Sequence, residues 1–164
     1  MAVINGVDVD EIKQKQEQVK KDPAAGEREP KIAARWKGGS ATRIEFGDVV
    51  SNIGGDGNLN AMQTLLAALA ACDIDLVAMN GALIGLPIDE LWIEISGHFN
   101  TQAYFGVENA PGSGYDRIAY TVHIKAPKAT PAQIKYLKER CERSSPVGDS
   151  LSKSIPLTLE IKSD

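Results

Sequence analysis

Residues 60–85, NAMQTLLAALAACDIDLVAMNGALIG, lie in the longest part of the chain without proline. They are rich in Ala, Leu and Met, which lose little entropy when a helix forms. Larger apolar side chains and one cysteine recur at steps of three and four, which places them along one side of a helix: Met62, Leu65, Leu69, Cys72, Leu76, Met79 and Leu83. Because alanines fill much of the remaining surface, the stretch predicts a long, buried central helix.

The length and charge of the chain narrow its class. A chain of 164 residues predicts one domain, which we place at 31–164, preceded by an N-terminal helix and linker at 1–30. The formal net charge is −4 and the basic residues are scattered, so we expect no nucleic-acid or membrane partner. The first residues lack the basic segment followed by an apolar segment that is typical of a secretory signal. Asp73 and Asp75 argue against a membrane-spanning helix. We therefore expect a cytoplasmic protein.

The segments around the central helix predict an α+β fold. Acids early and lysines late in Val7–Lys21 favour a surface helix. Thr130 and Pro131 are typical of a helix start, so a second core helix is expected from there to Ser144, with a short helical turn after it. Alternating apolar residues and turn signals predict strands elsewhere, namely two strands within 31–50, one at 87–100, one at 115–126 and a final one at 155–161.

Cys72 is the first candidate for chemistry because it lies in the middle of the central helix. A reactive thiol needs its thiolate form, and therefore a cation or a helix N-terminus close by. The middle of a helix supplies neither, and free cysteines often only fill a core. Cys141 follows Ile134 and Leu137 at steps of three and four, so it also faces a core. The two thiols could form a redox pair or could both be packing residues.

Arg43 is the candidate partner for a thiolate or a peroxide oxygen, with Arg35 as a second choice. The alternative is that both arginines lie on a solvated strand face. His98 and His123 fall on predicted strands with no acid–base companion visible in the sequence. The two cysteines and two histidines match no zinc or iron–sulfur spacing, so we expect no metal and no other cofactor.

Three stretches together resemble the OsmC/Ohr family, named for osmotically inducible protein C and organic hydroperoxide resistance protein. The run LLAALAACDIDLVAMNGALIGLPIDELWIEISG at 65–97 resembles the family's signature helix, with its small residues and cysteine, and the following strand. The tail SSPVGDSLSKSIPLTLEI at 144–161 and the opening KIAARWKGG at 31–39 are similar to the family as well. The resemblance covers roughly residues 31–162.

This resemblance implies both a fold and an activity. The implied fold is α+β, with two chains intertwined as a homodimer and the long central helices packed between β-sheets. The implied activity is that of a cysteine peroxidase in the oxidative or osmotic stress response. Cys72 matches the cysteine that attacks an organic hydroperoxide and becomes a sulfenic acid. A second cysteine then forms a disulfide, which an external dithiol reduces, and an arginine stabilises the first thiolate.

The chain departs from the family pattern at the second cysteine and at the helix entry. Ser145 precedes Pro146 where the second cysteine is found, and Cys141 lies four residues earlier. The family's Asn-Pro-Glu entry is here Asn-Ala-Met-Gln at 60–63, so the acid that orients the arginine is absent. We assign Cys72 as the attacking thiol, Cys141 as a displaced second thiol and Arg43 as the thiolate partner.

Two further readings stay open. In one, the chain is a catalytically impaired dimer of this fold that binds an apolar small molecule or acts as a one-cysteine redox sensor. In the other, it is a structural partner protein that acts through Val7–Lys21.

Overall fold

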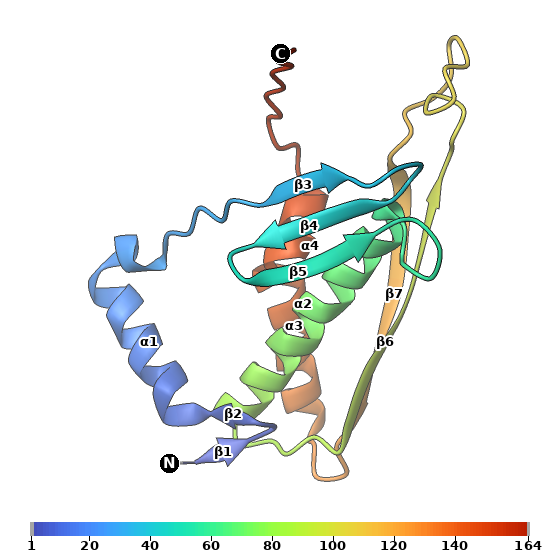
Figure 1. Ribbon diagram of the computed structural model, residues 1–164. Coiled ribbons are helices and arrows are strands. Elements are labelled where there is room, and N and C mark those ends of the chain that lie inside the picture. The colour runs from blue at the N-terminus through green and yellow to red at the C-terminus, as the bar shows by residue number, and fades with distance from the viewer. Residues whose placement is uncertain (1, 164) are drawn as a thin grey trace.

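The computed structural model describes residues 2–163 and builds an α+β fold around one long helix, α2 (Ala61–Leu83) (Figure 1). The start of α2 is fixed by two reciprocal hydrogen bonds: the Gln63 amide donates to Asn60 Oδ1 at 2.9 Å, and the Asn60 amide donates to Gln63 Oε1 at 3.0 Å. Gln63 therefore caps the helix at the place where the family has its acid. The predicted central helix is confirmed.

A long antiparallel hairpin and a second helix cover one side of α2. The hairpin consists of β6 (Glu90–Phe99) and β7 (Tyr115–Lys125), with Ile93 paired with Val122. The second helix, α3 (Pro131–Ser144), leads directly into the short α4 (Pro146–Ser152). The core lies where these elements meet, and its buried residues are Leu76, Val77, Leu86, Leu137 and Cys141.

The N-terminal residues fold back onto the end of α2. Two short strands, β1 (Val3–Ile4) and β2 (Val7–Asp8), pair before α1 (Val9–Lys21) begins. Between them, the Asn5 side chain donates to the carbonyls of Ala78 and Leu86 and accepts from the Ile88 amide. The predicted first helix is therefore two residues shorter, because Val7 and Asp8 are used in strand pairing and Asp8 caps the helix. A 3₁₀ turn, η1 (Pro23–Gly26), follows α1.

A three-stranded sheet holds the segment that we predicted as two strands. Its strands are β3 (Ala33–Trp36), β4 (Thr42–Phe46) and β5 (Val49–Ile53), paired in that order. The prediction treated β4 and β5 as one strand because the turn between them is only two residues long. Gly47 there has a φ of 56°, which glycine adopts without strain.

The final strand predicted at 155–161 is wrong for the single chain, where these residues have no regular secondary structure. Their alternating pattern is real, since every second residue is apolar, but a strand needs a neighbouring edge for its hydrogen bonds. The apolar side chains are instead exposed, by 49% at Ile155, 93% at Leu157, 84% at Leu159 and 84% at Ile161. In Figure 1 this C-terminal tail extends away from the rest of the chain.

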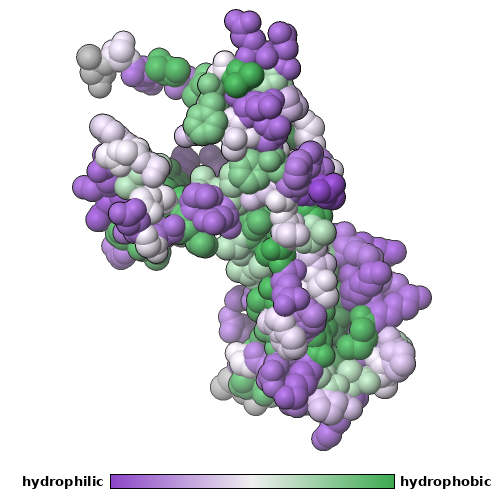
Figure 2. All heavy atoms as spheres, turned by 90° about the vertical axis from the view of Figure 1, so that its right-hand side faces the viewer, coloured by the Kyte–Doolittle hydropathy of each residue, from purple (hydrophilic) through white to green (hydrophobic). Residues whose placement is uncertain are grey.

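The single chain buries only one side of α2. The buried residues follow Leu69, Asp73, Leu76, Val77 and Asn80 to the end of the helix. The other side, which includes Ala61, Ala68, Ala71 and Asp75, is exposed. α2 is also long and apolar enough to cross a membrane by composition, with a mean hydropathy of 1.6. Figure 2 shows apolar side chains reaching the surface in the lower half of the molecule.

Candidate active site

Cys72 and Ser145 meet where α2 passes the junction of α3 and α4. The Ser145 hydroxyl donates to Cys72 Sγ at 3.6 Å, a distance within the reach of a hydrogen bond to sulfur. Ser145 is only 2% exposed, whereas Cys72 is partly exposed. The hydroxyl therefore holds a proton donor against the sulfur. The position where the resemblance implies a second cysteine therefore does contact Cys72, through a hydroxyl.

The backbone fixes the orientation of Ser145. Its hydroxyl oxygen accepts a hydrogen bond from the Gly148 amide at 3.1 Å, because Ser145 is the N-cap of α4. Gly148 allows this close approach, since a Cβ at that position would lie 3.0 Å from Ser145 Oγ. With the oxygen occupied as an acceptor, the hydroxyl proton is available to Cys72.

Cys141 lies one helical turn before Ser145 and is buried at 9% exposure. Four residues of helix rise by about 6 Å, so Cys141 is brought close to the Cys72–Ser145 contact without sharing it. Both cysteines are free thiols. Burial raises the pKa of Cys141 to about 11, and the Asp73 carboxylate, Cys72 and Glu142 add to the effect. Cys141 is therefore a neutral thiol near pH 7.

Asp73 follows Cys72 in the chain but points to the buried side of α2. It is fully buried. Tyr120, on β7, is its phenolic neighbour. Burial is the main cause that raises the pKa of Tyr120 above its usual range, and the Asp73 carboxylate is the next. Tyr120 thus stays a neutral hydrogen-bond donor.

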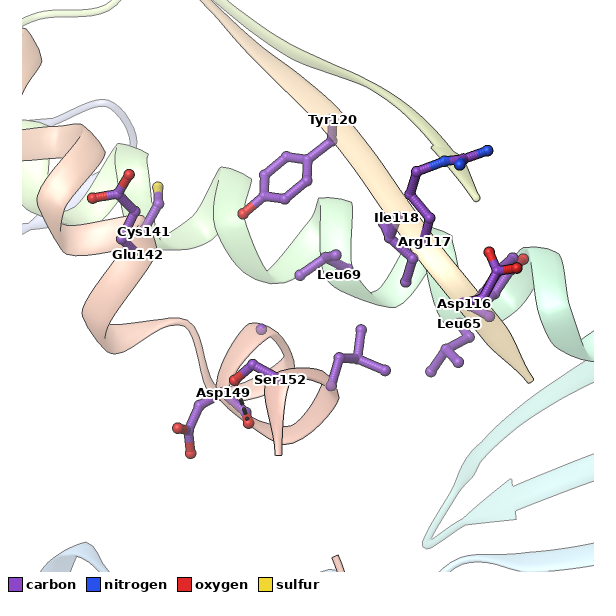
Figure 3. A pocket seen from close by; sticks show the side chains of 13 residues that line it. Leu65, Leu69, Asp116, Arg117, Ile118, Tyr120, Cys141, Glu142, Asp149 and Ser152 are labelled. Carbon is purple, nitrogen blue, oxygen red and sulfur yellow. Dashed lines mark hydrogen bonds between the residues drawn. The ribbon is translucent and has the colours of Figure 1, made fainter. Parts of the chain in front are cut away.

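Two cavities border this group, one toward each end of α2. The first has a volume of about 460 Å³ and is shown in Figure 3; the second has a volume of about 560 Å³. Tyr120, Cys141 and Glu142 line both of them. The rest of the first wall combines apolar Leu65, Leu69, Ile118 and Leu151 with charged Asp116, Arg117 and Asp149. The rest of the second wall is mostly apolar, with Val77, Val122, Ile124, Ile134 and Leu137.

Arg43 lies on β4, where its Nε donates to Glu45 Oε1 at 2.7 Å. Arg35 pairs with Arg43 across the sheet and reaches the same carboxylate at 3.4 Å. The hydrogen bond from Arg43 is the main cause that lowers the pKa of Glu45. The structure therefore joins the two candidate arginines to one another through Glu45. It does not bring Arg43 to Cys72 within the single chain.

The two histidines lie on the exposed face of the long hairpin. His98 is 2.9 Å from Asp116, and His123 is 3.2 Å from Glu94, so each imidazole has a carboxylate partner that the sequence did not reveal. His123 also stacks on Trp92. Among residues 2–163, no group of three or more His, Cys, Asp and Glu side chains is arranged to hold a metal ion.

The sequence interpretation missed Asp73 and Tyr120 as members of this site. We used Asp73 only as an argument against a membrane-spanning helix, although it stands four residues after Leu69 and four before Val77, on the side that is buried. That spacing was the available signal. Tyr120 lies on a strand whose residues alternate between two faces. Nothing in the sequence shows which helix Tyr120 contacts.

Comparison with known proteins supports the resemblance drawn from the sequence. The family model of OsmC-like protein matches residues 54–160, which include both cysteines, Asp73 and Ser145 but exclude Arg43. No curated protein matches the chain at a significant level.

Solved structures show the same fold at low sequence identity. The OsmC-like protein of Mycoplasma pneumoniae is 17% identical with a TM-score of 0.65, over 77% of this chain and 89% of that one. An OsmC-like protein of unknown function from Vibrio cholerae is 12% identical with a TM-score of 0.56, over 76% and 94%. An organic hydroperoxide resistance protein OsmC from Legionella pneumophila is 14% identical with a TM-score of 0.52, over 76% and 89%. With the family model covering most of the chain, the protein belongs to the OsmC-like family.

Proposed function

We propose that the protein is a thiol-dependent peroxidase that reduces organic hydroperoxides through Cys72. The observation that carries this proposal is the hydrogen bond from Ser145 to Cys72 Sγ, which holds a proton donor against a partly exposed sulfur. A neighbour in the fold that is named an organic hydroperoxide resistance protein agrees with this chemistry.

The proposed reaction has two steps before reduction. The Cys72 thiolate attacks the outer oxygen of the hydroperoxide, the O–O bond breaks, and Cys72 becomes a sulfenic acid. The departing alkoxide takes up the proton that Cys72 lost on ionising and leaves as the alcohol. Cys141 then attacks the Cys72 sulfur, which releases water and forms a disulfide. An external dithiol reduces this disulfide by exchange. Cys141, one turn from Ser145, takes the part that a cysteine at position 145 plays in the family.

The proposal includes a homodimer, because one chain leaves apolar surface uncovered on α2 and on residues 155–161. In the single chain Arg43 is engaged with Glu45 and has no contact with Cys72. Arg43 as the cation that stabilises the thiolate stays a prediction, and it requires that the three-stranded sheet of a second copy approach Cys72.

The test is to mix the reduced protein with cumene hydroperoxide and follow its intact mass and free thiols. We expect loss of both thiols and a mass lower by two hydrogen atoms, as a disulfide requires. Cys141→Ser should stop at a sulfenic acid on Cys72, and Cys72→Ser should not react. A wild-type protein that keeps both thiols over minutes would contradict the proposal.

A designed second cysteine sharpens the same test. Ser145→Cys places a thiol where Ser145 Oγ now lies 3.6 Å from Cys72 Sγ, so a modest shift allows a disulfide. We expect this variant to form the Cys72 disulfide faster than the wild type, even when combined with Cys141→Ser. No disulfide in the double variant would mean that the α3–α4 junction does not hold position 145 against Cys72.

Binding of an apolar small molecule is the second candidate function. It is favoured by the two cavities beside Cys141, whose volumes of about 460 and 560 Å³ fall in the range of small-molecule sites. If this is the function, cumyl alcohol should bind and protect Cys141 from alkylation while the hydroperoxide leaves Cys72 unoxidised. Oxidation of Cys72 within minutes would favour the peroxidase.

A further inference from the structure

The inner face of β7 runs along both cavities. Its residues line the cavities in chain order, the first cavity, then both, then the second, at Ile118, Tyr120, Val122 and Ile124. Residues two apart lie on one face of a strand, and six residues of strand span about 20 Å. The two cavities are therefore successive parts of one trough along β7, which we call the β7 trough.

The helices form the opposite wall of the β7 trough in the same order. On α2, Leu69 lines the first cavity and is 4% exposed, and Val77, two turns later, lines the second and is 1% exposed. On α3, Leu137 lines the second cavity, whereas Cys141 and Glu142, near the end of the helix, line both. The floor of the trough is thus buried and apolar at both ends.

Tyr120 divides the β7 trough at its middle. In Figure 3 its ring projects from β7 toward α2, with Cys141 on one side and Leu69 on the other. Its hydroxyl interacts with the buried Asp73 carboxylate, which lies on α2 one turn after Leu69 and one turn before Val77. This interaction holds the ring across the boundary between the two cavities.

The acids along the first wall already have basic neighbours. Asp116 pairs with His98, Glu142 with Lys138, and Asp149 with Lys153. Among the described residues that line the first cavity, Arg117 is the one cation, and Figure 3 shows its guanidinium pointing away from the apolar interior around Leu69.

The charges of the β7 trough therefore disfavour an anionic ligand. In the second wall, the cation Lys138 is 3.6 Å from Glu142 and is already used in that ion pair. A carboxylate on the ligand would approach Glu142 in either cavity, and it would have to leave water for apolar walls without a free cation to meet it. An uncharged apolar molecule has neither cost.

We propose that the β7 trough binds an uncharged, unbranched apolar molecule, such as an alkyl alcohol or an alkyl hydroperoxide, and that Tyr120 limits the length of chain it accepts. This inference rests on the proposed function in taking a hydroperoxide as a natural member of this class. The trough is connected to Cys72 through Gly148, which lines the first cavity and whose amide holds the Ser145 hydroxyl that donates to Cys72.

The first experiment measures how binding depends on chain length. The fluorescent probe N-phenyl-1-naphthylamine, which is uncharged, is bound to the full chain near pH 7 and displaced by straight-chain alcohols from butan-1-ol to decan-1-ol. Affinity should rise about fourfold per methylene while the chain fills one cavity, and should level off when the chain reaches Tyr120. A rise that continues unchanged to decan-1-ol overturns the role of Tyr120, and no displacement by any alcohol overturns the ligand class.

Truncation of Tyr120 should open the partition. In Tyr120→Ala the affinity should continue to rise for the longer alcohols, so that decan-1-ol binds at least about tenfold more tightly than to the wild type. Tyr120→Leu, which keeps an apolar but shorter side chain, serves the same test if Tyr120→Ala does not fold. The matched control is Tyr104→Ala, because Tyr104 is 77% exposed and lines neither cavity. Levelling at the wild-type length in a folded Tyr120 variant contradicts the proposal.

A matched pair of ligands tests the charge preference. Octan-1-ol should displace the probe at least about tenfold better than octanoate near pH 7. Glu142→Gln removes the carboxylate that both walls share and should narrow this difference, whereas Glu139→Gln, which changes an acid outside both walls, should not. Equal displacement by octan-1-ol and octanoate in the wild type overturns the preference for an uncharged ligand.

These measurements contain no hydroperoxide, so they separate the β7 trough from the proposed peroxidase. Alcohols that bind with the expected length limit support the trough even if cumene hydroperoxide leaves Cys72 unoxidised, a result that would remove only the peroxidase. Oxidation of Cys72 in a protein that binds no alcohol would instead overturn the trough and leave the peroxidase in place.

Discussion

The two sides of α2 contain similar residue types and have opposite surroundings. One side packs against α3, β6 and β7 and buries Leu76, Val77 and Asn80. The other side presents alanines to solvent, and the apolar tail at 155–161 is exposed as well. The difference shows that one chain buries only part of the apolar surface of its central helix.

The reacting groups follow this division. Cys141 and Asp73 lie on the packed side, where burial raises the pKa of Cys141, whereas Cys72 is partly exposed at its edge. In the proposed cycle, a hydroperoxide would reach Cys72 from the open side and Cys141 would approach it from the core. Substitutions on one side of α2 should therefore leave the other side intact.

The largest effect is expected from the exposed tail. Replacing Leu157, Leu159 and Ile161 together by serine removes three side chains that are each at least 84% exposed in the single chain. If a second copy buries them, each contributes about 1.5–3 kcal/mol, so the dimer dissociation constant should rise at least about a thousandfold. Sedimentation velocity measures this shift. The control replaces Thr158 and Glu160, the alternate residues, and an unchanged dimer in the triple variant would show that the tail is not at an interface.

Leu137→Ala tests the packed side. Leu137 is 1% exposed at the centre of the core, so its truncation should lower the free energy of unfolding by about 3 kcal/mol. Urea denaturation measures the loss. Leu157→Ala, studied at concentrations where the chain is monomeric, should change it by less than about 0.5 kcal/mol. Equal losses at the two positions would mean that the two sides are packed alike.

The contrast between the sides also explains what the sequence could and could not predict. The periodicity of 60–85 predicted the length of α2 correctly, because propensity and capping are local. It did not show which side is buried, since alanines make every side of the helix compatible with packing, and so the burial of Asp73 was not predicted. The strand at 155–161 was predicted from alternation alone, although its partner edge is not in the chain. The contact between Ser145 and Cys72 joins residues far apart in sequence, and the family resemblance pointed to it where periodicity could not.

Asn80→Ala tests the polar part of the packed side. The Asn80 side-chain oxygen accepts from the Tyr136 hydroxyl at 3.1 Å and from Arg140 Nε at 3.0 Å, and its amide donates to the Leu76 carbonyl. Truncation leaves both donors on α3 without this acceptor, and should cost about 2 kcal/mol of unfolding free energy. Thermal unfolding checks the value, with Lys135→Ala on the exposed face of α3 as control. A loss equal to that of the control would mean that water replaces the acceptor.

Ser145→Ala has the smallest expected effect and examines the boundary between the two sides. The variant removes the cap of α4 and the proton donor to Cys72 together. Loss of the cap should cost about 1 kcal/mol of unfolding free energy. Loss of a hydrogen bond of similar worth should slow oxidation of Cys72 by cumene hydroperoxide about fivefold, since the thiolate is less stabilised. Ser150→Ala is the control because the exposed Ser150 hydroxyl donates to the Pro146 carbonyl of the same short helix. A variant that loses stability but oxidises at the wild-type rate would show that Ser145 serves only as a cap, and that the reactivity of Cys72 comes from the open side, where Arg43 of a second copy is the predicted cation.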